Sequence, residues 1–309
     1  MSNIKEYSFS SVSGLSDIYA RAYLPENNEI KAIFQIAHGM AEHADRYDWF
    51  ADKLTQAGYA VFINNHLGHK LSVKDDSQLG FFGDKDGWKN LVADQRKLTE
   101  LARNEFPGLP IIAFGHSMGS FICRAYTAEY HDVDAAIYCG TGGPNPAAAA
   151  GITIANIVAK IKGNMHKSKL IDKIAFGSYN KRCPGRTPFD WLTKDEKIVD
   201  KYVADPYCGF LFTACGYRDL FSSLNFVSQN DWAGKVEKDM PIFLIAGQED
   251  PVGTYGEGVK KVYEMLKDSG HTDVQLKLYQ GDRHEILNEL DRDIVAADII
   301  AFADKALNK

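Results

Sequence analysis

Ser117 is the residue whose surroundings most clearly predict chemistry. It lies in the pentapeptide Gly115-His116-Ser117-Met118-Gly119, after an apolar run at 111–114 and before a helix-like run at 120–130. A G-x-S-x-G sequence between a strand and a helix predicts a nucleophile elbow, in which a sharp turn exposes the serine hydroxyl above a sheet. The two glycines remove Cβ atoms that would collide within the turn. The predicted chemistry is nucleophilic attack, which needs a base, an acid and an oxyanion hole nearby.

Two later residues are candidates for the acid and the base. Asp250 follows an apolar run at 242–246, and His284 follows another at 274–279. Both positions lie past the carboxyl ends of predicted strands, where open α/β sheets place their sites. We assign Asp250 as the orienting acid and His284 as the base. The competing interpretations are Glu249 or Asp282 as the acid, or Asp250 and His284 as loop residues that cap the turn and helix following them.

The loop His38-Gly39-Met40-Ala41-Glu42-His43 is the candidate oxyanion hole. It follows an apolar run at 31–37, and Gly39 allows close approach of the backbone. The oxyanion formed in acyl transfer needs two preorganised N–H donors. We assign the backbone amides of Met40 and of Met118, the residue after the serine, to this role.

Short apolar runs alternate with helical patterns in two parts of the chain, at 1–143 and at 233–309. This alternation predicts an α/β fold with a mostly parallel, eight-stranded sheet and helices on both faces. A hairpin is expected at the start, with strands at 7–11 and 17–24. The alternation of strand and helix patterns stops between 144 and 232, where only a helix at 147–161 is predicted. We expect this segment to be an inserted, mainly helical cap, because a loop of that length without structure would be unusual.

Five segments together carry a resemblance to a known family. They are the loop His38–His43 with Arg46-Tyr47, Asn65-His66-Leu67-Gly68-His69, the pentapeptide around Ser117, Gly247-Gln248-Glu249-Asp250, and Arg283-His284-Glu285-Ile286-Leu287-Asn288-Glu289. With these motifs the chain resembles the monoacylglycerol lipase and lysophospholipase group of serine α/β-hydrolases, over nearly its whole length outside the cap. The resemblance implies hydrolysis of a carboxylic ester of a single-chain lipid or a similar small molecule, through an acyl-enzyme intermediate and without cofactor or metal.

The same resemblance implies Ser117 as nucleophile with Asp250 and His284 as its partners, and a cap over an acyl tunnel. This sequence departs from the family pattern at three positions outside the triad. Asn65 stands where Asp is common, Lys70 where Gly is common, and Ser120 where a second glycine often follows the elbow. We expect the Ser120 hydroxyl either to crowd the packing of helix on strand or to bond to the backbone.

Aromatic residues are frequent in the cap, and they suit either an acyl chain or the cap's own core. We expect substrate contacts from Gly39, His116, Tyr179 and Phe212. The apolar helix that begins at 147 is interpreted as buried, with transient contact to a membrane or micelle through the cap as the alternative.

Three other functions stay open. A short-chain or hydroxycinnamoyl (feruloyl-type) esterase would use the same triad with a different pocket. A serine aminopeptidase would need acidic groups in the cap to bind the substrate amine, and several are present: Asp190, Asp195, Glu196, Asp200, Asp205 and Asp219. A non-catalytic binding module conflicts with an intact set of Ser, Asp and His.

Composition sets the remaining expectations for this chain of 309 residues. A hydrophobic content of 45% and a charged content of 25% are ordinary for a globular protein. The net charge of −6 argues against nucleic acid as a partner. Five cysteines without metal-binding spacing, and a start without a secretory pattern, predict reduced thiols and a cytoplasmic protein. The sequence makes no prediction of the oligomeric state.

Overall fold

An eight-stranded sheet forms the centre of the computed structural model, which describes residues 3–26, 29–229 and 231–308. The strands are β1 (Asn3–Ser10), β2 (Asp17–Leu24), β3 (Ala32–Ala37), β4 (Tyr59–Asn64), β5 (Ile111–His116), β6 (Ala135–Cys139), β7 (Ile242–Gly247) and β8 (Val274–Tyr279). They lie in the order β1-β2-β4-β3-β5-β6-β7-β8. β2 pairs antiparallel with β1 and β4, and the remaining neighbours are parallel. The predicted α/β fold with a mostly parallel sheet is thereby confirmed.

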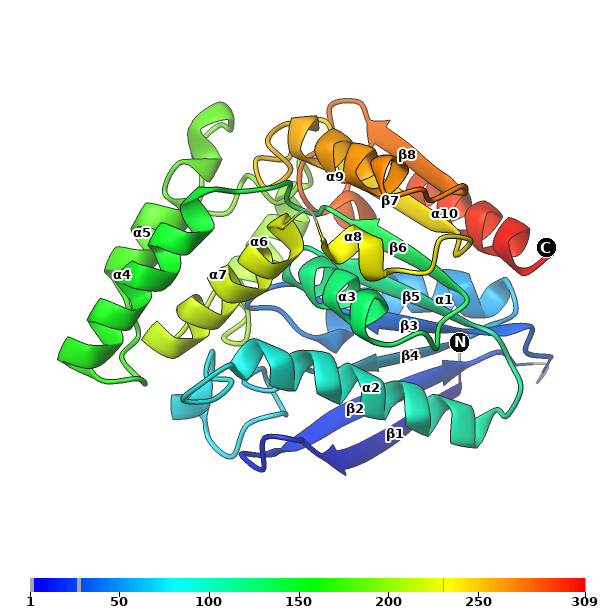
Figure 1. The fold of residues 1–309 in the computed structure, drawn as a ribbon, viewed down its shortest axis with the longest axis horizontal. Coiled ribbons are helices and arrows are strands. Elements are labelled where there is room, and N and C mark those ends of the chain that lie inside the picture. The colour runs from blue at the N-terminus through cyan, green and yellow to red at the C-terminus, as the bar shows by residue number, and fades with distance from the viewer. Residues whose placement is uncertain (1–2, 27–28, 230, 309) are drawn as a thin grey trace.

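Helices cover both faces of this sheet, as parallel strands joined by crossovers require. The helices outside the middle segment are α1 (Asp48–Gln56), α2 (Gly87–Glu105), α3 (Met118–Glu129), α8 (Trp232–Lys235), α9 (Glu257–Asp268) and α10 (Arg292–Leu307). α1 and α10 pack on one face, and α2, α3, α8 and α9 pack on the other (Figure 1). Short 3-10 turns lie at Ala44–Tyr47, Asp76–Gln78, Tyr179–Arg182 and Ile286–Asn288. Because β3 to β7 are buried along their whole length, their ends are fixed positions from which loops can present side chains.

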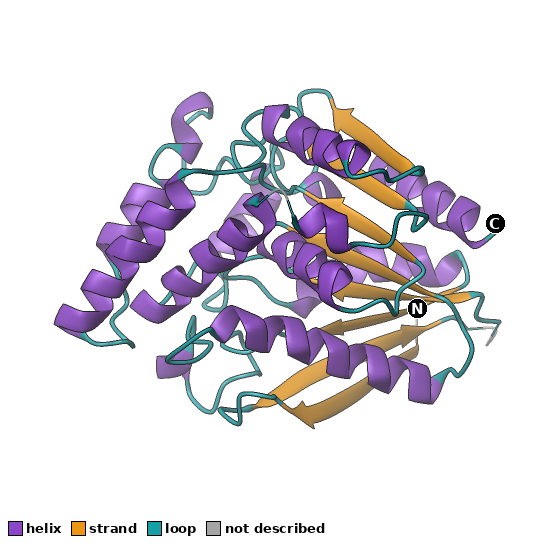
Figure 2. Ribbon diagram, in the orientation of Figure 1, coloured by secondary structure: helices purple, strands orange, loops and turns teal. Residues whose placement is uncertain are grey.

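The described part of the segment 144–232 contains four α-helices between β6 and α8. They are α4 (Ala147–Lys162), α5 (Lys169–Phe176), α6 (Glu196–Ala204) and α7 (Ala214–Ser228). α4 packs along α7, and the group sits at the carboxyl end of the parallel strands (Figures 1 and 2). The sequence pattern predicted α4 but not the other three. Within the described parts of the chain, no helix combines the length and apolar character needed to cross a membrane.

Candidate active site

Ser117 lies at the sharp turn between β5 and α3. Its φ of 55° and ψ of −121° place a non-glycine residue in a backbone region that L-residues rarely adopt. A Cβ at Gly119 would lie 2.1 Å from the carbonyl oxygen of Ala37 at the end of β3, so only glycine allows the elbow to approach so closely. The Ser120 hydroxyl donates to the Ser117 carbonyl at 2.6 Å. Of the two expectations for Ser120, bonding to the backbone is therefore the one observed.

Asp250 and His284 come together from the loops after β7 and β8. His284 Nδ1 lies 3.0 Å from Asp250 Oδ2, and both side chains are buried. Asp250 Oδ1 accepts a hydrogen bond from the amide of Val252 at 2.8 Å, which fixes the carboxylate with its other oxygen toward the ring. A proton on Nδ1 facing this carboxylate leaves Nε2 of His284 free to accept a proton. Ser117 and His284 line the same cavity.

The two competing carboxylates have other partners. Glu249 is exposed, and its carboxylate lies 3.9 Å from the guanidinium of Arg182. Asp282 is buried and accepts a hydrogen bond from Lys194 at 2.8 Å. The geometry thus favours Asp250 as the partner of the histidine.

The loop 38–43 runs against the elbow, because a Cβ at Gly39 would lie 3.3 Å from the Cβ of Ser117. The amides on either side of Met40 are both hydrogen-bonded, one within the loop and one to a residue outside it. Gly39 N donates to Glu42 Oε1 at 2.5 Å, and Ala41 N donates to His69 Nε2 at 3.3 Å. Met40 and Met118 both line the cavity that contains Ser117.

His38 of this loop packs against two more buried histidines, His66 and His69, and the sequence reasoning assigned these three residues no role. His38 packs against His66 and His69 with ring centroids 4.1 and 5.0 Å apart. Burial lowers the pKa of His66 to about 4 and the pKa of His69 to about 3, so both rings are neutral at pH 7. His38 Nε2 accepts from the amide of His66, and His66 Nε2 donates to the carbonyl of His38, both at 3.0 Å. The motif Asn65–His69 was the feature of the sequence that could have predicted this histidine cluster.

A buried charge network joins the loop 38–43 to the residue after His284. Arg46 donates to both oxygens of Glu285 and to Glu42, each at 2.6 Å. Although burial opposes ionisation, the charges of Arg46 and His116 hold the pKa of Glu42 well below its usual range. Burial likewise disfavours the charged ring of His116, but Glu42, 3.4 Å from its Nδ1, raises the pKa of His116 overall. Buried charges of this kind require such pairing, and the pairing fixes the two loops relative to each other.

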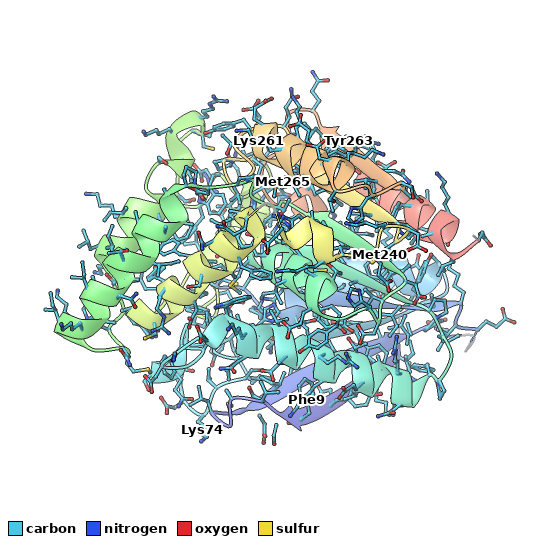
Figure 3. The ribbon with its side chains drawn as sticks, viewed as in Figure 1. Phe9, Lys74, Met240, Lys261, Tyr263 and Met265 are labelled. Carbon is cyan, nitrogen blue, oxygen red and sulfur yellow. The ribbon has the colours of Figure 1, made fainter. Side chains whose placement is uncertain are left out.

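A cavity of about 720 Å³ opens over Ser117 and His284. Much of its wall comes from the segment 144–232, through aromatic side chains that include Phe176, Tyr179, Phe189, Trp191, Phe210 and Phe221. Lys261 of α9, labelled in Figure 3, also lines it. The Trp191 ring lies 5.1 Å from the ring of His284, centroid to centroid.

Three of the four expected substrate contacts line this cavity: Gly39, His116 and Tyr179. Phe212 does not line it. Its ring is fully buried and packs 5.1 Å from the ring of Phe82 and 5.5 Å from that of His69, centroid to centroid. Phe212 lies in an irregular stretch just before α7, where no periodic pattern predicts which way an aromatic side chain points, and tertiary packing turned it toward the core.

The family described as serine aminopeptidase, S33 matches residues 28–291. The chain belongs to this family. It is 27% identical over 307 residues to a monoacylglycerol lipase of Mycolicibacterium smegmatis, covering 96% of each chain. It is 26% identical over 279 residues to the human monoglyceride lipase, covering 88% of this chain and 81% of the human protein.

Among solved structures, a thermostable carboxyl esterase from Bacillus coagulans in complex with glycerol superposes with a TM-score of 0.93. The two are 32% identical, and the alignment covers 99% of this chain and all of the esterase. These relatives confirm the resemblance to the monoacylglycerol lipase group. The protein is a serine α/β-hydrolase that cleaves carboxylic esters, and its relatives do not favour the peptidase or binding-module alternatives.

Proposed function

We propose that this hydrolase cleaves the ester bond of monoacylglycerols and related single-chain lipids. The observation that carries the proposal is one cavity that connects Ser117 and His284 to a largely aromatic and aliphatic wall. Its volume of about 720 Å³ lies within the range of small-molecule sites. The lipases named among the relatives support an acylglycerol substrate. The glycerol in the Bacillus coagulans esterase complex supports it too, because glycerol is the alcohol that monoacylglycerol hydrolysis releases.

The proposed mechanism is acyl transfer in two steps. Nε2 of His284 takes the proton of Ser117, whose oxygen attacks the ester carbonyl carbon, while Asp250 stabilises the protonated ring. The tetrahedral intermediate collapses, and the alcohol leaves with the proton from His284. Water, deprotonated by the same histidine, then attacks the acyl-serine and releases the fatty acid.

The amides of Met40 and Met118 are proposed to bind the oxyanion of each tetrahedral intermediate. Met118 N lies at the start of α3, where helix amides point outward and favour negative charge. Met40 is placed by the bonds of its neighbours Gly39 and Ala41. Preorganised donors of this kind avoid the cost of reorienting solvent dipoles as charge develops.

We assign residues 144–232 as a cap inserted into a core of residues 1–143 and 233–309. Hydrogen bonds join this cap to the loop that carries His284 and to the loop 38–43. The carbonyl of Trp191 accepts from the amide of His284 at 3.4 Å, and Ala41 O accepts from the amide of Gly209 at 2.9 Å. Substrate therefore reaches Ser117 through a space whose walls depend on the cap's position.

The outer side of α4 and α5 is proposed to contact lipid surfaces transiently. Ile161 is 74% exposed, and Leu170 and Ile174 are each 60% exposed. Exposed lysines flank them, at 160, 162, 169 and 173. Apolar side chains bordered by lysines suit the interface of an anionic membrane. Ile174 also lines the cavity, so this surface adjoins the route to Ser117.

We also propose that the protein is located in the cytoplasm. All five cysteines are free thiols, which supports a reducing compartment.

A substrate panel tests the proposed function. The measurement is kcat/KM for monoacylglycerols from C4 to C18, lysophosphatidylcholine, methyl ferulate and an aminoacyl amide. We expect the highest values for a medium- or long-chain monoacylglycerol, because each methylene buried in the cavity contributes about 0.8 kcal/mol. A maximum at C4 or at methyl ferulate would contradict the lipid assignment while leaving the esterase chemistry intact.

A further inference from the structure

Three metal-binding side chains meet where the cap contacts the loop 38–43, called the oxyanion loop below. They are His43, Asp205 and Cys208. Their imidazole nitrogen, carboxylate oxygen and thiol sulfur all lie within 4.8 Å of one another. His43 Nε2 is 2.9 Å from Asp205 Oδ2. Imidazole, carboxylate and thiolate are the ligand types of Zn²⁺, at typical distances of about 2.0–2.3 Å. Small side-chain rotations would bring all three ligand atoms to one ion.

The cap supplies two of these ligands from a single turn. The amide of Cys208 donates to the carbonyl of Asp205 at 3.0 Å, so two residues separate the ligands, as in many zinc-binding pairs. Asp205 Oδ1 accepts from the amide of Tyr207 at 2.8 Å, which leaves Oδ2 directed at His43. The side chain of Asp205 is partly exposed and that of His43 is buried. A cation can therefore reach the cluster from solvent on the Asp205 side.

A second carboxylate lies behind the histidine. Asp45 Oδ1 is 3.8 Å from His43 Nδ1. Histidine ligands of metals commonly donate their other ring N–H to a carboxylate, which orients the ring. Lys70 lies beside this pair, 2.5 Å from Asp45 Oδ2 and 3.4 Å from His43 Nδ1. The Lys70 ammonium repels a cation bound to the three ligands. Lys70 therefore weakens the site without blocking the ligand atoms.

We propose that His43, Asp205 and Cys208 form a binding site for a divalent cation of the Zn²⁺ type, and that its occupancy slows ester turnover. The cation bonds to the Cys208 sulfur as the thiol proton leaves to solvent. His43 binds through Nε2 after the ring proton has moved to Nδ1, and Asp205 supplies the second negative charge. The two anionic ligands balance the charge of the ion, and water completes the coordination.

Slower turnover follows from where the ion would sit. The cap already bonds to the oxyanion loop at Ala41, whose carbonyl accepts from the amide of Gly209 and from the hydroxyl of Tyr202. A metal bridge between His43 and the turn 205–208 would fasten these parts together and restrict cap movement. This consequence rests on the proposed function, whereas metal binding itself does not.

Titration of the full chain with Cd²⁺, free of chelator, tests the site. Cd²⁺ bound to thiolate gives an ultraviolet charge-transfer band. Zn²⁺ should displace the bound Cd²⁺ and remove the band. We expect the wild type and Cys183→Ser to show the band at one equivalent, and Cys208→Ser to lose it. Cys183 is the matched control, because it is the other partly exposed cysteine. Lys70→Met should bind Cd²⁺ more tightly than the wild type, because the substitution removes a positive charge beside the site.

No band in the wild type, or an unchanged band in Cys208→Ser, would overturn the site. Thermal unfolding of each variant shows whether it is folded. Hydrolysis of a water-soluble ester with and without Zn²⁺ tests the regulation: we expect inhibition of the wild type, reversal by EDTA, and resistance in Cys208→Ser. Stoichiometric binding with unchanged turnover would overturn the regulation alone. A wild type that binds Cd²⁺ but hydrolyses no ester would contradict the proposed function instead.

Discussion

Ser117 occupies a backbone conformation that costs about 1–3 kcal/mol, and the surrounding structure compensates for it. Its amide donates to the carbonyl of Cys139 at 2.9 Å, and its carbonyl accepts from the Ser120 hydroxyl. These bonds come from a neighbouring strand and from the following helix. The strained conformation is therefore fixed by regular structure on both sides and directs the residue into the cavity.

Replacing Asp250 by Asn should lower kcat by about 10³- to 10⁴-fold, because the amide can stabilise the wrong histidine tautomer. The substitution keeps the size of the side chain, so the melting temperature should change little. The measurement is hydrolysis of a water-soluble ester. Glu249→Gln serves as the control, with activity near that of the wild type because Glu249 is exposed. Comparable losses in both variants would contradict the assignment of Asp250.

Among individual residues, the sequence analysis could predict the positions of those that directly follow the end of a strand. Asp250 and His284 were placed after β7 and β8 from two short apolar runs, together with the chain order of serine, acid and histidine. The network of Glu42, Arg46 and Glu285 was not foreseen, because Arg46 and Glu285 are 239 positions apart in the chain. Only the folded arrangement shows that these charges meet.

The cap helices show why the middle segment was hard to interpret. Apolar residues of α4 serve three purposes: Ala155 is buried, Ile154 lines the cavity, and Ile161 is exposed. One helix with three apolar environments loses the single apolar face on which periodicity depends. The sequence analysis did not use the N-cap residues of α5, α6 and α7. The side chains of Ser168, Asp195 and Thr213 accept hydrogen bonds from the first-turn amides of these helices, and residues of these types are typical of helix starts.

The double substitution Ile161→Asp and Leu170→Asp should weaken binding to vesicles that contain anionic lipid. Both side chains are exposed, so the fold should tolerate the change. We expect activity on monoacylglycerol presented in vesicles to fall several-fold, with activity on a water-soluble ester unchanged. Vesicle co-sedimentation measures the binding. An equal loss on both substrates would show damage to the active site, and unaltered vesicle binding would contradict the proposed lipid contact.

The whole molecule carries buried acids whose ionisation affects its stability. Burial raises the pKa of Asp219 in α7 to about 7, although the neighbouring charge of Arg218 opposes the shift. A carboxyl whose pKa is raised in the folded state stabilises the fold at pH values below its unfolded pKa of about 4, and this contribution is lost as the pH rises toward 7. Asp219 therefore favours the folded state least at neutral and higher pH.

Asp219→Asn should consequently gain stability relative to the wild type as the pH rises from 4 to 7. The free energy of unfolding, measured by denaturant titration at several pH values, gives the difference. The exposed Asp231, whose pKa is lowered by Lys235, provides a control as Asp231→Asn. A stability difference for Asp219→Asn that falls or stays constant over this range would contradict the assigned ionisation.

The global fold was the most predictable property, since alternating strands and helices leave few arrangements other than a parallel sheet covered on both faces. The central claim is narrower: Ser117 is the nucleophile that opens a monoacylglycerol ester. The most direct measurement is kcat of Ser117→Ala on a monoacylglycerol, with the melting temperature as a check on folding. A folded variant with activity reduced by roughly 10⁴-fold or more is the predicted result. A folded variant that retains activity within tenfold of the wild type would contradict it.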